Sequence, residues 1–197
     1  MAFGDRAAER CTYLLEPKNW LAITVLAVGW HADRLAGIGW GLVALVFAAV
    51  IPTLFIGYGI RRGRWTDRNV GTRGARLVVL GFITASVAVG LVLLIVLGGP
   101  RQLAGYLAFM LASVALLALV SAVWKISIHC AVASGSVAVL VCAFGPPLVA
   151  GYALVALVGW SRIAMKDHTL VQVLAGAALG GGAAAVAYTL TGGFGGS

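Results

Sequence analysis

A series of apolar runs, each about as long as a bilayer is thick, constrains this chain more than any other feature. A helix needs roughly 20 predominantly apolar residues to cross the hydrocarbon core of a membrane. The runs that meet this requirement are residues 35–60, 77–98, 103–124 and 169–191. With 61% hydrophobic and only 10% charged residues, the composition is that of a polytopic membrane protein. We therefore expect an all-α bundle of transmembrane helices.

One further apolar run, residues 128–160, is too long for a single span. The sequence Gly145-Pro146-Pro147 interrupts it, and proline ends a helix because it lacks a backbone donor and its ring clashes with the preceding turn. Two short spans are therefore predicted there, which makes six. Residues 19–30 are ambiguous, because an apolar segment of this length with tryptophan at both ends can cross as a seventh span or lie in the interface.

These runs predict one transmembrane domain over residues 1–197. Within it, residues 1–34 form an N-terminal segment that is interfacial or weakly spanning, and residues 192–197 form a flexible tail. No cleavable signal peptide is expected, since residues 1–18 include three acidic side chains and lack an apolar core that ends in small residues.

Positive charge gathers at the ends of the spans and gives a net charge of +8. This placement favours anionic lipid headgroups or a phosphate substrate as partners, and not nucleic acid. Counting spans puts three polar segments, residues 61–76, 125–129 and 161–168, on the same membrane face. They carry nine Lys or Arg side chains against two on the opposite face, so the positive-inside rule places them in the cytoplasm.

The last of these segments brings a histidine and a cation together. Gln172 follows His168 by four residues, on the same face of the predicted helix. Its side-chain carbonyl can accept a proton from one ring nitrogen and leave the other nitrogen free to attack phosphorus. Arg162, six residues before His168, can bind a phosphate group with its planar fork of donors.

A second histidine lies in the middle polar segment. His129 follows Ser127 by two residues and Lys125 by four, so Lys125 and His129 share a face if this segment is helical. His129 can protonate a leaving alkoxide as a general acid. We expect Arg162, Lys125 and arginines of the 61–76 loop to hold the phosphate oxygens, and Ser127 to donate one more hydrogen bond.

Simpler interpretations apply to several of these residues. The two histidines can be interfacial anchors, and most arginines of the 61–76 loop are explained as a topology signal. Gly176 and Gly180 form a GxxxG pattern that predicts helix packing. A metal or other cofactor is not expected, because Asp67 and Asp167 are the only carboxylates on this face and Asp67 is more simply a loop salt bridge.

Together, these residues resemble the type 2 phosphatidic acid phosphatase (PAP2) superfamily of membrane lipid phosphatases, in a variant typical of a bacterial subgroup. Its third motif reads Ser-Arg, five residues, His, three residues, Asp. The chain matches this spacing but ends it with Gln172. Its second motif, Pro-Ser-Gly-His, is similar to residues 126–129. Its first motif reads Lys, six residues, Arg-Pro, and Arg76 stands at the arginine, with Asn69 at the lysine and Leu77 at the proline.

The resemblance implies that His168 is a nucleophile that forms a phosphohistidine, that His129 is the general acid, and that no metal takes part. It also implies that phosphate is bound by Arg76, Arg162 and Ser127, with Arg73 and Lys125 as further candidates. Asp167 is a candidate to support His168 in place of the missing carboxylate. The implied substrates are polyprenyl phosphates or diphosphates and phosphatidic-acid-like lipids. An anion transporter and a non-catalytic headgroup-binding protein stay open as alternatives.

Overall fold

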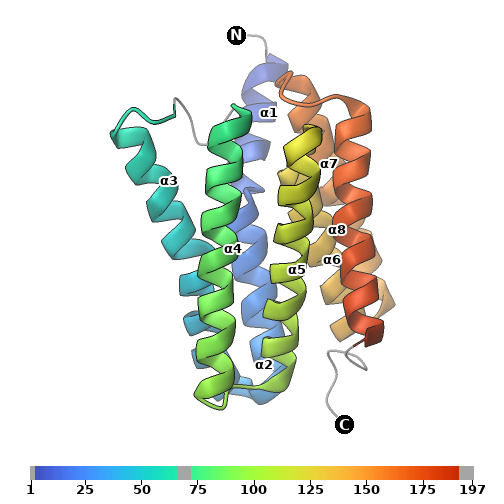
Figure 1. Cartoon of the computed structure of the whole chain (residues 1–197). Coiled ribbons are helices and arrows are strands. Elements are labelled where there is room, and N and C mark those ends of the chain that lie inside the picture. Colours follow the sequence, from blue (N-terminus) through green and yellow to red (C-terminus); the bar gives the residue numbers. More distant parts are fainter. Residues whose placement is uncertain (1–2, 66–71, 191–197) are drawn as a thin grey trace. The chain divides into compact units, whose positions relative to one another are not determined.

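The computed structural model describes residues 3–65 and 72–190, with side chains over residues 6–65 and 72–187. Within these ranges the chain is helical and contains no strand (Figure 1). In chain order the elements are α1 (Phe3–Leu14), α2 (Pro17–Leu45), the π-helix η1 (Val46–Val50), α3 (Ile51–Arg61), α4 (Arg73–Val96), α5 (Arg101–Val123), α6 (Ile128–Phe144), the 3₁₀-helix η2 (Pro146–Gly151), α7 (Tyr152–Ala164) and α8 (Leu170–Leu190).

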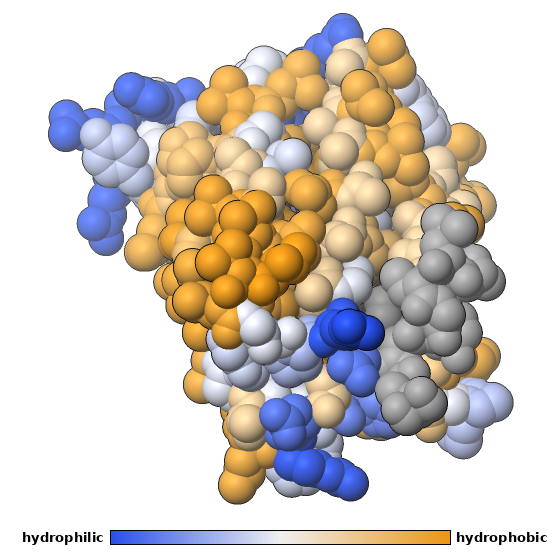
Figure 2. Space-filling view, turned by 60° about the horizontal axis from the view of Figure 1, so that its bottom comes forward, coloured by the Kyte–Doolittle hydropathy of each residue, from blue (hydrophilic) through white to orange (hydrophobic). Residues whose placement is uncertain are grey.

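Five helical stretches in the described ranges are long and apolar enough to cross a membrane, and α6 is a shorter apolar helix of 17 residues. Large apolar side chains cover much of the face drawn in Figure 2. Leu119 and Val123 are 70% and 82% exposed. Exposing such large apolar side chains costs free energy in water and does not in lipid. The chain is therefore a multi-pass membrane protein, and the predicted all-α fold is confirmed over the described residues. The count of six spans stays a prediction.

Two compact units make up the chain. The first consists of Met1–Thr24 together with Ile126–Ser197, and the second is Val25–Lys125. The prediction of a single domain therefore stays a prediction, and the predicted tail at residues 192–197 lies outside the described residues.

In the second unit, α2 turns back on itself. The backbone leaves the helical region at Asp33 and at Arg34, where φ is +44°. A side chain at Gly29 would collide with the backbone carbonyl of Gly37, and Gly41 lies against Val25, so the helix on either side of the turn packs antiparallel. The ambiguous residues 19–30 are thus helical, and whether they span stays a prediction.

The π-helix η1 accommodates Pro52, the second residue of α3. Proline has no N–H to donate to a preceding carbonyl, and η1 comes immediately before it. The hydroxyl of Ser86 in α4 donates to the carbonyl oxygen of Phe47 at 2.6 Å, five residues before Pro52. In a π-helix, the carbonyl oxygen of Phe47 would accept the N–H of residue 52, which proline lacks. The hydroxyl of Ser86 takes its place. Within lipid, every backbone polar group needs such a partner from the protein.

In the first unit, α6, α7 and α8 pack together, and α1 lies against α7 (Figure 1). The predicted break in residues 128–160 is confirmed: α6 ends before Gly145, whose φ is +104°, and η2 leads into α7. The predicted GxxxG packing is also confirmed. Gly176 of α8 lies against the carbonyl of Ser127 and Gly180 against that of Ala131, so the absence of side chains lets the two backbones touch.

This packing predicts different effects at two glycines of the same helix. A methyl group at Gly180 would collide with the Ala131 carbonyl, whereas nothing lies within 4 Å of one added at Gly182. We expect Gly180→Ala to reduce the free energy of unfolding by about 2 kcal/mol through overpacking. Gly182→Ala should leave it equal or raise it by up to about 1 kcal/mol. Denaturant unfolding in detergent micelles measures both, and equal effects would contradict the packing.

Candidate functional site

The turn between α7 and α8 explains the spacing between Arg162 and His168. The N–H of Asp167 donates to the carbonyl of Arg162 at 3.1 Å, and the N–H of Lys166 to that of Ile163 at 2.9 Å. With Lys166 in the left-handed region at φ +57°, this is a Schellman motif. The N–H of His168 also donates to the Arg162 carbonyl, at 3.2 Å. The turn therefore folds His168 back onto the end of α7.

Lys166 occupies a position that favours glycine, because a Cβ atom makes the left-handed conformation costly. We expect Lys166→Gly to raise the free energy of unfolding by about 1 kcal/mol. Lys166→Ala removes the same exposed ammonium but keeps a Cβ atom, so it should bring no such gain. Thermal unfolding of the three proteins checks this, and equal stabilisation by both substitutions would contradict the backbone explanation.

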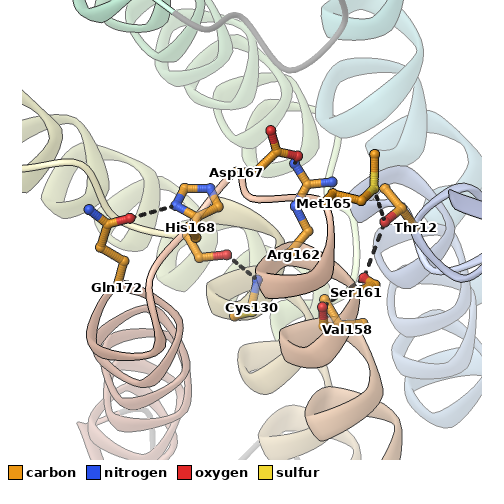
Figure 3. Close-up of polar contacts among 10 residues, drawn as sticks. Thr12, Cys130, Val158, Ser161, Arg162, Met165, Asp167, His168 and Gln172 are labelled. Atoms are coloured by element: carbon orange, nitrogen blue, oxygen red, sulfur yellow. Dashed lines mark hydrogen bonds and ion pairs between the residues drawn. The ribbon is translucent and has the colours of Figure 1, made fainter. Parts of the chain in front are cut away.

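Gln172 holds His168 at the start of α8 (Figure 3). The side-chain Oε1 of Gln172 lies 3.2 Å from Nδ1 of His168, as predicted. The same Oε1 accepts the N–H of Thr169 at 3.1 Å, while the hydroxyl of Thr169 accepts the N–H of Gln172 at 3.4 Å. This reciprocal pair is a capping box. A proton on Nδ1 that is donated to Gln172 leaves Nε2 with the lone pair.

The capping box was missed by the sequence prediction, although its signal, Thr169 followed three residues later by Gln172, is visible in the chain. It gives Gln172 a structural role besides its contact with the imidazole. The hydrogen bond from the N–H of Thr169 fixes the direction of Oε1 without any contribution from His168. The cap therefore orients the acceptor that holds the ring.

Arg162 is the most deeply buried cation of the first unit's described part, with 1% of its surface exposed. Its NH2 lies 2.5 Å from Oδ2 of Asp167. Its Nε and NH1 are buried and have no hydrogen-bond partner among the described residues. Buried donors without acceptors are costly, and three N–H bonds on two guanidinium nitrogens match the oxygens of a phosphate or a similar anion.

Ser127 precedes α6 as its N-cap residue, and His129 lies in the first turn of this helix. The Ser127 hydroxyl accepts the N–H of Cys130 at 3.4 Å as the N-cap of α6. Its backbone N–H donates to the carbonyl of Gln172 in α8 at 3.2 Å. His129 is half-buried, and its ring lies within range of the charges of Arg162 and His168. Three helices thus bring both histidines and the buried guanidinium together.

Lys125 and His129 were expected to share a face only if the segment that contains them is helical, and this condition is not met. The chain is not helical between Trp124 and Ser127, and α6 begins only at Ile128. The reason is the N-cap, since Ser127 must adopt an extended backbone (φ −82°, ψ 102°) for its hydroxyl to reach into the first turn. Lys125 is exposed and is the last residue of the second unit, so its predicted role at the phosphate stays a prediction.

The other predicted phosphate ligands belong to the second unit. Arg76 in α4 is 8% exposed, and its Nε has no partner among the described residues. Arg73 is exposed at the first position of α4. Asp67 and Asn69 lie outside the described residues. That Arg73 and Arg76 contribute to the same site as His168 stays a prediction.

Ser161, although part of the predicted motif, serves to attach α1. Its hydroxyl is fully buried, donates to the carbonyl of Val158 at 2.8 Å and accepts the hydroxyl of Thr12 at 3.1 Å. Figure 3 shows Thr12 on the side of α7 away from His168. No signal in the sequence indicates that Thr12 meets Ser161, because 149 residues separate them.

No protein-family model matches the chain, nor does any curated protein or solved structure. In the part of the chain that the structure describes, no group of three or more His, Cys, Asp or Glu side chains is placed to hold a metal ion. The function of the site must therefore follow from its geometry, which consists of two histidines, a buried guanidinium and the groups that orient them.

Proposed function

We propose that this chain is a membrane lipid phosphatase that hydrolyses a lipid phosphate or diphosphate through a phosphohistidine on His168. The observation that carries the proposal is the buried guanidinium of Arg162, with two nitrogens that lack partners among the described residues. Arg162 lies near the end of α7, and the following turn folds the backbone of His168 onto this end. A fixed imidazole beside a fixed anion-binding group is what phosphoryl transfer to histidine requires.

In the first step, Nε2 of His168 attacks phosphorus, an N–P bond forms, and the bond from phosphorus to the lipid oxygen breaks. His129 donates a proton to the departing alkoxide. In the second step, a water oxygen attacks phosphorus and gives a proton to His129, the N–P bond breaks with its electron pair returning to Nε2 of His168, and inorganic phosphate leaves. Arg162 binds the non-bridging oxygens throughout. Gln172 accepts the Nδ1 proton and keeps Nε2 directed at phosphorus.

Gln172 stabilises the charged phosphoimidazolium less than a carboxylate would, because an amide oxygen carries only a partial charge. The carboxylate of Asp167 is paired with Arg162 and offsets the guanidinium charge. The proposed enzyme therefore depends on positioning by the capping box more than on a charged partner of the ring.

The exposed apolar side chains support a substrate that enters from the lipid, with its headgroup at the site and its tail between helices. Polyprenyl phosphates or diphosphates and phosphatidic-acid-like lipids meet this requirement. We propose six spans in the cell membrane of a bacterium, with the site on the cytoplasmic face. The cation asymmetry of nine against two supports this orientation.

One observation favours a second candidate, a protein that binds lipid headgroups without turnover. The capping box accounts for the position of Gln172 without any catalytic role. The anion-binding nitrogens of Arg162 would serve such a protein equally well.

A phosphate-release screen in EDTA separates these functions. The purified protein in mixed micelles is given polyprenyl phosphate, polyprenyl diphosphate, phosphatidic acid or phosphatidylglycerol phosphate, and free phosphate is measured. Release with at least one lipid supports the phosphatase. Binding of these lipids without release supports the headgroup-binding protein. Anion flux across liposomes without release would overturn both in favour of a transporter.

A further inference from the structure

The carboxylate of Asp167 lies against the buried guanidinium of Arg162. Its Oδ2 is 2.5 Å from NH2, and its side chain is 31% exposed while that of Arg162 is 2% exposed. The guanidinium of Arg162 is therefore shielded from water, whereas the carboxylate of Asp167 is partly in contact with it. Only one of the three guanidinium nitrogens is engaged in this way, since Nε and NH1 have no partner among the described residues.

Backbone hydrogen bonds hold Asp167 at this position independently of its carboxylate. Its N–H donates to the carbonyl of Arg162, and the left-handed conformation of Lys166 directs the chain there. The Schellman motif needs the backbone N–H of residue 167 and not its carboxylate, so any residue except proline can form it. The turn therefore does not require a negative charge at position 167.

We propose that Asp167 is the counterion of Arg162 and sets the affinity of the site for phosphate low enough for the product to leave. This inference rests on the proposed function. A phosphate that binds Nε or NH1 shares the guanidinium of Arg162 with the carboxylate, so two anions lie close together at this side chain. Their repulsion is strong where water is scarce. It weakens bound inorganic phosphate, whereas Arg162 without this neighbour would retain it.

The test compares Asp167→Asn with the unmodified full chain in detergent. Asparagine keeps the size of the side chain and an oxygen for NH2 of Arg162, and removes only the charge. We expect the Kd for inorganic phosphate, measured by titration calorimetry, to fall about tenfold. Inhibition of turnover by added phosphate should strengthen in parallel, and kcat should fall as product release slows. Asp167→Ser, which removes the charge with a smaller side chain, should also bind phosphate more tightly.

Two further variants show whether the charge at this position is responsible. Asp167→Glu keeps the charge and should bind phosphate with the affinity of the unmodified protein, within about twofold. Glu9→Gln removes one negative charge from an exposed position on α1 and should leave phosphate binding unchanged. Equal or weaker phosphate binding by both Asp167→Asn and Asp167→Ser would overturn the inference.

The failure of this inference differs from the failure of the proposed function. If the unmodified protein releases phosphate from lipids and the charge-removing variants bind phosphate no more tightly, only the role of Asp167 is wrong. If the unmodified protein neither binds inorganic phosphate nor releases it from lipids, the phosphatase itself is wrong and the inference falls with it.

Discussion

His168→Asn protein is expected to release phosphate from lipid phosphates at least about 10⁴-fold more slowly than the unmodified protein. Asparagine can still donate a proton to Oε1 of Gln172, which now lies 3.2 Å from Nδ1 of His168, but it has no atom that corresponds to the nucleophilic Nε2. The substitution therefore removes the nucleophile and leaves the hydrogen bond between residue 168 and Gln172, as well as the capping box of α8. The loss is large because neither Arg162 nor His129 can replace a group that forms a covalent bond with phosphorus.

Two measurements check this prediction. Phosphate release is followed with the lipid that the screen identifies, and the protein is tested for a phosphate label that acid removes and base does not, which is typical of phosphohistidine. The label should form on the unmodified protein and be absent from His168→Asn. His31→Asn, a change in the second unit near the turn of α2, should retain both activity and label. Turnover by the His168→Asn protein would show that another group attacks phosphorus.

Arg162→Lys should reduce kcat/KM by about 10²- to 10³-fold, the usual effect of removing one preorganised donor from a transition state. Lysine keeps the positive charge that Asp167 faces in the buried end of α7, so the fold should survive. Its single ammonium cannot bind Asp167 and two phosphate oxygens in the fixed planar arrangement that a guanidinium provides. Both substrate and phosphate binding should therefore weaken together.

The kinetic constants of the Arg162→Lys protein, together with its thermal unfolding, measure this loss separately from any loss of stability. Arg101→Lys makes the same chemical change at an exposed position at the start of α5 and should have activity within about twofold of the unmodified protein. A fully active Arg162→Lys protein would mean that the unpartnered nitrogens of Arg162 do not contact the substrate.

Local signals in the sequence predicted much of the fold. The apolar runs located the helices, and Gly145 with the two prolines after it located the break between α6 and α7. Gly176 and Gly180 predicted the contact between α8 and a neighbouring helix. These predictions succeeded because each depends on the backbone geometry or the hydrophobicity of a short segment of the chain.

Predictions that depended on an assumed local conformation were less secure. The contact between His168 and Gln172 was predicted from helical spacing and is present, because α8 begins where that spacing requires. The same rule predicted a shared face for Lys125 and His129 only if their segment is helical. The segment is not helical, because Ser127 is extended as the N-cap of α6. A spacing rule holds only inside a helix, and a serine at the boundary decides where the helix starts.

The order of residues was enough to predict a helical membrane protein in which His168, Gln172 and Arg162 lie near one another, since short segments connect them. The burial of Arg162, and the position of His129 at the start of α6 near it, depend on the packing of the helices. Burial depends on the helices that surround a side chain. Those neighbours are distant in the sequence, so no local pattern specifies them.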